Sequence, residues 1–196
     1  MDLVSEVMTY NASQGKPAYA AIINRLDRPV SGLVLIAKNK SAAAKYSTLM
    51  QKEGGFNKQY EALICGKLSE LKGTFVDYLK KDGRTNTSAI VPADAAANDK
   101  EAKLSKLEYE VISYDEVKDI THVRIHLITG RHHQIRVQFA SRRHPLVGDY
   151  KYATADCGMD NAVKAVAFKR NQIALCAVSL TVDNKTYSVA PEFSIG

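Results

Sequence analysis

Short apolar runs of strand length recur along this chain, and several are separated only by a few turn residues. Such spacing favours strands joined by hairpins, because a parallel crossover needs a much longer connection. One pair of runs meets across Asp183 and Asn184, which suit a tight turn. We therefore predict an α+β fold around a largely antiparallel sheet. The expected strands are residues 18–24, 33–37, 58–65, 73–80, 104–113, 120–129, 172–181 and 185–189.

Three segments have the apolar spacing of helices that flank such a sheet. Residues 2–13 carry apolar side chains at helical spacing, and either Asn39 or Ser41 can cap a helix that ends at Gln51. Residues 131–141 place Ile135 and Phe139 on one face. Residues 92–103, rich in alanine and aspartate, are predicted to form a loop.

The length and composition favour one domain that occupies residues 1–196. No apolar run approaches the length of a membrane span, and the acidic N-terminus does not resemble a signal peptide. The three cysteines have no metal-type spacing and suit free thiols in a reducing compartment. We expect a cytoplasmic monomer without a membrane partner.

Positive charge is concentrated in two segments, although the net charge of the whole chain is only +6. Residues 121–152 contain six arginines and lysines against Asp149 alone, together with all five histidines. Residues 24–40 contain four arginines and lysines against Asp27 alone. This distribution favours a polyanionic partner such as RNA, although a solvated basic surface would have the same composition.

Asp27 lies at the expected end of a strand, between Arg25 and Arg28. Two neighbouring guanidinium groups favour the ionised form of a carboxyl group, which a nucleophile or an electrostatic stabiliser requires. Pro29, Gly32 and a continuous apolar run follow. The segment therefore predicts a functional acid on a tight turn.

Several common catalytic signatures are absent from the sequence. It contains no glycine-rich phosphate loop, no G-x-S-x-G elbow and no C-x-x-C pair. The histidine pairs 132/133 and 122/126 could bind a metal, but no matching cluster of cysteines or carboxylates accompanies them. We therefore predict neither a metal site nor a cofactor.

Four segments occur in the order of the motifs of a known enzyme family. They are Arg25–Leu33 around Asp27, Lys58–Tyr60, Thr129–Arg136 and His144–Tyr152. Together they resemble the motifs of the RluA (ribosomal large subunit) family of pseudouridine synthases over roughly residues 20–190. The resemblance implies that family's catalytic fold, with an active-site cleft across the middle of a mixed sheet. It also implies isomerisation of a specific uridine in structured RNA, with rRNA ahead of tRNA as substrate and no cofactor.

The resemblance also implies three catalytic residues. Asp27 matches the family's nucleophile, whether it attacks the ribose, attacks the ring or promotes elimination. Arg136 matches the arginine that pairs with this aspartate, and a bidentate guanidinium would hold the carboxylate ionised and oriented. Tyr60 matches the tyrosine that stacks on the base and can take the C5 proton. Without the resemblance, Tyr60 reads as a half-buried strand residue and Arg136 as a phosphate clamp.

Six further residues are expected to contact RNA. Arg25 matches an arginine that fills the gap left by a flipped base, since a stacked uridine cannot react. Arg28 reads equally well as a structural ion-pair residue. The remaining residues, which would bind phosphates or 2′-hydroxyl groups, are Arg131, His132, His133 and Gln134.

The chain also departs from the family pattern. Asn24, Gln138 and Cys176 stand where the family usually has histidine, so the hydrogen bonds beside the site are expected to differ. Only 26 residues precede Asp27, so we expect a catalytic domain with a shortened N-terminus and no separate RNA-binding domain. A catalytically impaired RNA-binding protein is the alternative. An aspartate-based RNA hydrolase would need a second carboxylate or a metal near Asp27, which the sequence does not indicate.

Overall fold

The computed structural model describes residues 2–52, 55–167 and 171–195. Its main sheet has eight strands in the order β11-β10-β4-β8-β7-β5-β6, with β2 paired to β10 outside that path. Only the β2–β10 pair is parallel among the described pairs. The predicted α+β fold with a largely antiparallel mixed sheet is therefore confirmed. The strands are β2 (Ser31–Gly32), β4 (Asn57–Cys65), β5 (Lys72–Asp82), β6 (Thr87–Val91), β7 (Lys103–Asp115), β8 (Ile120–Leu127), β10 (Leu175–Val182) and β11 (Lys185–Ser188).

Two smaller ladders and five helices complete the described structure. Asp2 caps the first helix and Asn39 caps the second by accepting hydrogen bonds from backbone N–H groups of the first turn. The helices predicted around residues 2–13 and 41–51 are confirmed. The small ladders pair β1 (Ala21–Ile22) with β3 (Ile36–Ala37) and β9 (Val166–Ala167) with β12 (Ser194–Ile195). The helices are α1 (Leu3–Ser13), α2 (Lys40–Gln51), α3 (Ala93–Ala96), α4 (Gln134–Ala140) and α5 (Met159–Ala165).

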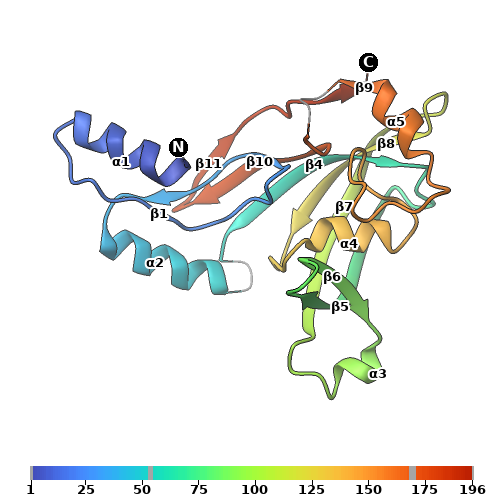
Figure 1. Ribbon diagram of the computed structural model, residues 1–196, viewed down its shortest axis with the longest axis horizontal. Coiled ribbons are helices and arrows are strands. Elements are labelled where there is room, and N and C mark those ends of the chain that lie inside the picture. The colour runs from blue at the N-terminus through green and yellow to red at the C-terminus, as the bar shows by residue number, and fades with distance from the viewer. Residues whose placement is uncertain (1, 53–54, 168–170, 196) are drawn as a thin grey trace.

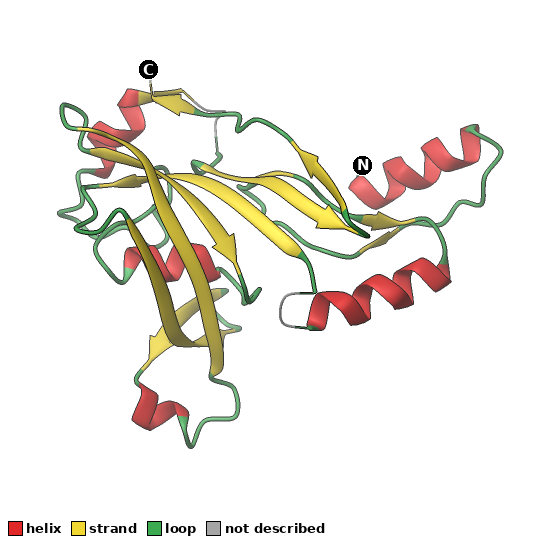
Figure 2. Cartoon of the chain, turned by 180° about the vertical axis from the view of Figure 1, so that it is seen from behind, coloured by secondary structure: helices red, strands yellow, loops and turns green. Residues whose placement is uncertain are grey.

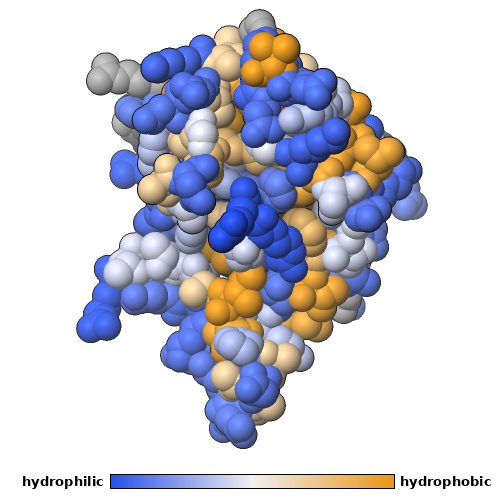
Figure 3. All heavy atoms as spheres, turned by 90° about the vertical axis from the view of Figure 1, so that its right-hand side faces the viewer, coloured by the Kyte–Doolittle hydropathy of each residue, from blue (hydrophilic) through white to orange (hydrophobic). Residues whose placement is uncertain are grey.

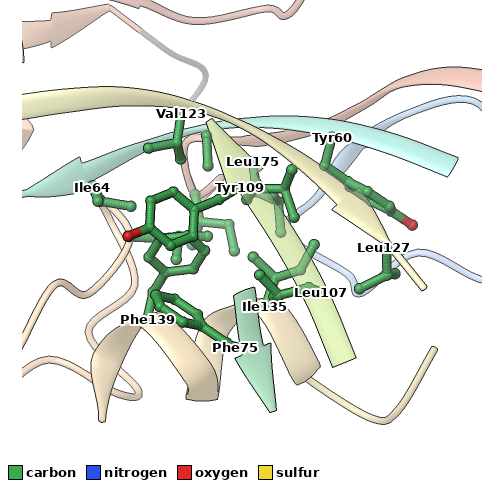
Figure 4. Packing of buried hydrophobic residues seen from close by; sticks show 14 of the residues in the cluster. Tyr60, Ile64, Phe75, Leu107, Tyr109, Val123, Leu127, Ile135, Phe139 and Leu175 are labelled. Carbon is green, nitrogen blue, oxygen red and sulfur yellow. The ribbon is translucent and has the colours of Figure 1, made fainter. Parts of the chain in front are cut away.

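The two faces of the sheet bury separate apolar clusters. Ala62 and Ile64 of β4 face α4, whereas Leu63 and Cys65 of the same strand face the side of α5. This alternation follows from the two-residue period of a strand. Figure 4 shows the α4-side cluster, in which the rings of Phe75, Tyr109 and Phe139 lie together. Their centroids are 4.9 to 5.9 Å apart, within the range of favourable aromatic pairs.

Elements from distant parts of the chain lie on one side of the main sheet. Helices α2 and α4 lie on the same side in both ribbon views (Figures 1 and 2). Strands β5, β6 and β7, with α3, form an arm that extends away from the rest of the molecule. The central strands β4 and β8 span the space between these parts. A site on this side can therefore receive residues from four separate regions of the chain.

Several sequence predictions about elements were wrong in detail. Residues 18–24 and 33–37 form two-residue ladders rather than full strands, because the side chain of Asn24 bonds to the backbone of Leu33 and Leu35 in place of a longer ladder. The predicted loop over 92–103 contains α3, and β6, α5, β9 and β12 were missed. The helix predicted from residue 131 begins at Gln134.

Candidate active site

A short loop between β1 and β2 carries Asp27. The carbonyl of Asp27 accepts a hydrogen bond from Val30 N at 2.9 Å, which closes a tight turn. Behind the turn, Asn24 donates to Leu33 O at 3.1 Å and accepts from Leu35 N at 2.6 Å. Because these bonds join the two ends of the loop, they fix the position of the Asp27 carboxylate.

A second loop, which precedes α4, is held by the side chain of Gln134. Its Oε1 accepts from Arg131 N at 3.0 Å and from the Thr129 hydroxyl at 2.9 Å. Its Nε2 donates to Lys106 O and to Gln138 Oε1, both at 3.1 Å. Gln134 is therefore buried and fully engaged within the protein. The loop ends at His133, which adopts a left-handed conformation with φ 54°.

Arg136, in the first turn of α4, lies between two carboxylates. It donates to Asp149 from Nε at 2.7 Å and from Nη2 at 2.8 Å, a bidentate pair. Its Nη1 donates to Asp27 Oδ2 at 3.3 Å. Burial opposes the charged form, but the bonds to Asp149 and Asp27 raise the pKa of Arg136 above its ordinary value. Arg136 is thus a permanently charged group fixed beside Asp27.

The ion pair of Asp27 differs from the one that its sequence neighbours suggested. Its guanidinium partner is Arg136, which is 109 residues away in the chain. Arg25 and Arg28 are exposed, and within the described residues neither forms an ion pair. Tertiary contacts, rather than adjacent charges, therefore set the electrostatic environment of the carboxylate.

Two histidines from the loop before α4 also face this region. His133 Nε2 lies 3.7 Å from Asp27 Oδ2, and the rings of His132 and His133 stack with centroids 3.8 Å apart. His132 contacts Ser88 Oγ through Nδ1 at 2.9 Å and Asn86 Oδ1 through Nε2 at 3.2 Å. The stacked pair therefore connects the β5–β6 hairpin to the Asp27 loop.

Tyr60 of β4 lies where the core meets the cleft. Its ring belongs to the α4-side cluster, and its hydroxyl points away from the other core side chains (Figure 4). Burial, with a further contribution from the Asp27 charge, raises the pKa of Tyr60 to about 12. The phenol is therefore protonated at neutral pH, which suits a stacking surface or a hydrogen-bond donor better than a base.

These residues line one cleft of about 500 Å³, within the usual range for small-molecule sites. The cleft brings together all nine residues that the sequence predicted for catalysis or RNA contact. They differ in exposure: Arg25, Arg28 and Arg131 are exposed, whereas His133, Gln134 and Arg136 are buried. The predicted residues along the cleft are Arg25, Asp27, Arg28, Tyr60, Arg131, His132, His133, Gln134 and Arg136.

Three residues at or beside the cleft were not predicted to have a role. Asp149 holds Arg136, and Tyr152 contacts His133 Nδ1 at 2.6 Å. Burial lowers the pKa of Lys58, which lines the cleft. All three lie within the motif segments recognised in the sequence, and this position was the one sequence feature that could have identified them as site residues. Asp149 is the second carboxylate that the sequence did not indicate, but it is 1% exposed and both its oxygens bond to Arg136.

Across residues 2–52, 55–167 and 171–195, no group of three or more histidine, cysteine, aspartate or glutamate side chains is arranged to bind a metal. In the same part of the chain, every helix is too short or too polar to cross a membrane.

Comparisons with known proteins relate this site to one enzyme family. Residues 1–141 match the family model described as RNA pseudouridylate synthase. A ribosomal large subunit pseudouridine synthase D from Blochmanniella floridana is 36% identical over 135 residues, which are 68% of this chain and 38% of that relative. Its counterpart from Vibrio vulnificus is 30% identical over 177 residues, 89% of this chain and 51% of the relative. The chain thus spans about half the length, or less, of these curated relatives.

Solved structures agree at the level of the fold. Human RNA Pseudouridylate Synthase Domain Containing 4 superposes with a TM-score of 0.74 at 16% identity, covering 97% of this chain and 78% of that chain. Human RNA Pseudouridylate Synthase Domain Containing 1 gives 0.68 at 24% identity, covering 87% and 68%. Because the family model covers residues 1–141 of the 196, the chain belongs to the RNA pseudouridylate synthase family.

Proposed function

We propose that this protein converts a uridine in structured RNA to pseudouridine, with Asp27 as its nucleophile. Membership of the family supports the reaction class. One observation carries the assignment of the residue: Asp27 is paired with the buried Arg136 inside a cleft of about 500 Å³. A fixed guanidinium orients the carboxylate, and the cleft has space for a nucleoside.

The proposed reaction rearranges one base without a redox step. The bond from ribose C1′ to N1 breaks, the uracil turns, and a new bond forms from C1′ to C5. The proton displaced from C5 leaves to solvent or to a basic group, and N1 takes up a proton. A uridine within a stack cannot undergo this rotation, so the substrate nucleotide must be extruded into the cleft.

Tyr60 is proposed to support the extruded base with its ring. Its aromatic face is fixed by the core cluster, and a base gains about 1–3 kcal/mol from stacking on an aromatic side chain. The high pKa of Tyr60 favours this role over proton abstraction.

RNA contacts are proposed for the exposed residues around the cleft, Arg25, Arg28 and Arg131, and for the half-buried His132. Guanidinium groups bind phosphates well, which suits these positions. Gln134 is not included, because its amide is engaged by the loop before α4. Ribosomal RNA is proposed ahead of tRNA, since two relatives are named as ribosomal large subunit enzymes.

The first test replaces the proposed nucleophile. Asp27→Asn keeps the size and polarity of the side chain but removes the charge and the nucleophilic oxygen, so pseudouridine formation should be abolished while RNA affinity is retained. Release of tritium from RNA labelled at uridine C5 measures the reaction, and filter binding measures affinity. Ribosomal and transfer RNA serve as parallel substrates.

A matched variant controls for the loss of a carboxylate elsewhere. Asp94 lies in α3, outside the cleft residues, so Asp94→Asn should release tritium at the parent rate. Equal release from the Asp27→Asn and parent proteins would refute the role of Asp27. A parent protein that binds RNA but releases no tritium would instead support an RNA-binding protein with impaired catalysis.

A further inference from the structure

His133 occupies a position between Asp27 and Tyr152 that RNA contact alone does not explain. Only 8% of the residue is exposed, so it offers little surface to a ligand. Its Nε2 lies 3.7 Å from Asp27 Oδ2, and its Nδ1 lies 2.6 Å from the Tyr152 hydroxyl oxygen. The imidazole therefore connects the proposed nucleophile with a tyrosine on the opposite side of the ring.

The hydrogen bonds of Tyr152 favour one imidazole nitrogen of His133 as the carrier of the proton. Ser88 N lies 2.9 Å from the Tyr152 hydroxyl oxygen. A backbone N–H can only donate, so the hydroxyl oxygen is the acceptor in this hydrogen bond. The hydroxyl proton of Tyr152 is then available for Nδ1 of His133. A neutral imidazole that accepts at Nδ1 must carry its hydrogen on Nε2, the nitrogen that faces Asp27.

The surroundings of His133 favour this neutral form. Burial is the largest cause, and with the charges of Arg136, His132 and Lys151 it lowers the pKa of His133 to about 4, against the opposing effect of Asp27. The ring stacks on His132 and packs edge-on against Tyr152, with centroids 5.6 Å apart. Its orientation is thus fixed from both sides.

Arg136 and His133 both face the same oxygen of Asp27, and Arg136 forms a hydrogen bond with it. Arg136 Nη1 donates to Oδ2 at 3.3 Å, and His133 Nε2 lies 3.7 Å from that atom. Within the part of the chain that the structure describes, no hydrogen bond or ion pair engages Oδ1. Two donors on one oxygen orient a carboxylate and leave its other oxygen accessible.

We propose that His133 is a positioning residue for Asp27, with its tautomer set by Tyr152, and that Oδ1 of Asp27 is the oxygen that reacts. The inference rests on the proposed function only where it names a reacting oxygen. Arg136 binds Oδ2 and the imidazole N–H faces the same atom, so the carboxylate meets the substrate in one orientation. Tyr152 acts through His133.

The tautomer can be measured without any substrate. Two-bond ¹H–¹⁵N correlation spectra of the parent protein distinguish the two neutral imidazole tautomers, and His133→Gln identifies the resonances of His133. We expect a neutral ring at pH 7 with its proton on Nε2. A proton on Nδ1, or a charged ring at pH 7, would overturn the proposal even if the protein showed no activity.

Tyr152→Phe tests the link between the tyrosine and the histidine. The substitution keeps the ring that packs against His133 but removes the hydroxyl that donates to Nδ1, so the pKa of His133 should rise and its tautomers should mix. The single-turnover rate should fall about 3- to 10-fold, the value of one hydrogen bond, with RNA affinity unchanged. Tyr150→Phe removes a hydroxyl that bonds to Asp160 at 3.0 Å and should change neither quantity.

A pair of substitutions at His133 separates positioning from packing. His133→Ala removes the donor, and His133→Gln restores an amide N–H near the position of Nε2. We expect the alanine variant to lose about 10-fold or more in single-turnover rate and the glutamine variant to recover much of that loss. Equal rates in these two folded variants, both below the parent, would overturn the positioning role, and a parent rate in Tyr152→Phe would overturn the role of Tyr152. An inactive parent would count against the proposed function instead.

Discussion

At the scale of single residues, Arg136 organises the site because it binds two carboxylates, Asp149 more closely than Asp27. Its bonds to Asp149 are 2.7 and 2.8 Å, whereas its bond to Asp27 is 3.3 Å. Asp149 is buried, but the side chain of Asp27 is 28% exposed. Asp149 therefore fixes the guanidinium, and Asp27 keeps access to the cleft.

Asp149→Asn tests this division of roles. The amide cannot reproduce a bidentate ion pair, so the buried Arg136 charge would lose its principal partner. Removing one member of a buried pair costs about 3–5 kcal/mol, and we expect a loss near the lower end because asparagine retains one acceptor. Urea denaturation measures the free energy of unfolding, and tritium release measures activity, which should fall as well.

The control for Asp149→Asn is an aspartate on the surface. Asp160 lies in α5, and among the described contacts its carboxylate accepts a hydrogen bond only from the Tyr150 hydroxyl. Asp160→Asn should therefore leave the free energy of unfolding within about 0.5 kcal/mol of the parent. An unfolding free energy for Asp149→Asn that matched this control would contradict the structural role of Asp149.

The sequence predicted the two members of the Asp27–Arg136 pair but not the residue that anchors them. Asp27 and Arg136 are recognisable because each lies in a segment that resembles a family motif. Asp149 is a single acid in a basic segment, and its place in the motif segment His144–Tyr152 does not show which residue it contacts. Its role depends on α4 and the segment after it meeting in space.

At the scale of elements, the contact of β2 with β10 fixes the Asp27 loop. Cys176 pairs with Ser31 and Ala177 with Gly32, and Leu33 N donates to Ala177 O at 3.0 Å. Gly32 has φ +119°, which side chains rarely adopt, and a Cβ there would overlap the backbone of Ala177. Only glycine allows the two chains to approach this closely.

Gly32→Ala should therefore displace β2 and the loop that it supports. Backbone strain alone costs about 1–3 kcal/mol, and the overlap with Ala177 adds to it, so we expect a loss of at least about 2 kcal/mol in the free energy of unfolding. Thermal and urea denaturation measure it. The chemical step should also slow, because the Asp27 carboxylate loses its fixed position.

Gly83→Ala is the matched glycine control. A Cβ at Gly83 would meet no neighbouring atom within 4 Å, so alanine should be tolerated there. Stability of Gly32→Ala equal to that of Gly83→Ala would show that β2 can shift without cost, contrary to the close approach of Gly32 and Ala177.

The long strands and helices were predicted more accurately than the short ones. Strands β4, β7, β8 and β10 are long enough for alternation to identify them, and α1 and α2 carry caps in the sequence. The short elements β9 and α5 contain too few residues for a period to emerge, whereas an apolar pair indicated α4 and the Asp183–Asn184 turn indicated β11. These short elements form because they pack against distant residues. In the α5-side cluster, Val166 of β9 and residues of α5 are buried together with Phe193.

At the scale of the whole molecule, hydrophilic residues cover much of the surface, and apolar residues are interspersed in separate patches on the side shown in Figure 3. The net charge is +6, and the exposed arginines at the cleft place part of it beside the proposed site. Long-range attraction of a polyanion depends on this distribution. RNA binding should therefore weaken as salt concentration rises.

Arg28→Gln should reduce that salt dependence. Arg28 is exposed at the cleft and has no ion pair within the described residues, so its loss should leave the fold intact. If it binds one phosphate, the slope of log K against log salt should decrease by about 1, and affinity should fall uniformly across RNA sequences. Fluorescence anisotropy over a salt series measures both.

Lys164→Gln provides the comparison for charge alone. Lys164 lies in α5, which packs on the face of the sheet opposite the cleft. This variant changes the net charge by the same amount, but its salt slope should match that of the parent. An equal change of slope in both variants would indicate a diffuse charge effect instead of a contact at Arg28.

The sequence alone determined the fold class and the family motifs and predicted Asp27 as the functional acid, because strand alternation, turn residues and charged motifs are local patterns. Only the tertiary structure showed that Asp149 holds Arg136, that Arg136 binds Oδ2 of Asp27, and that Tyr152 contacts both His133 and Ser88. These features depend on distances between segments far apart in the chain, such as the 109 residues between Asp27 and Arg136. Such distances are fixed by packing across the sheet, which no local pattern records.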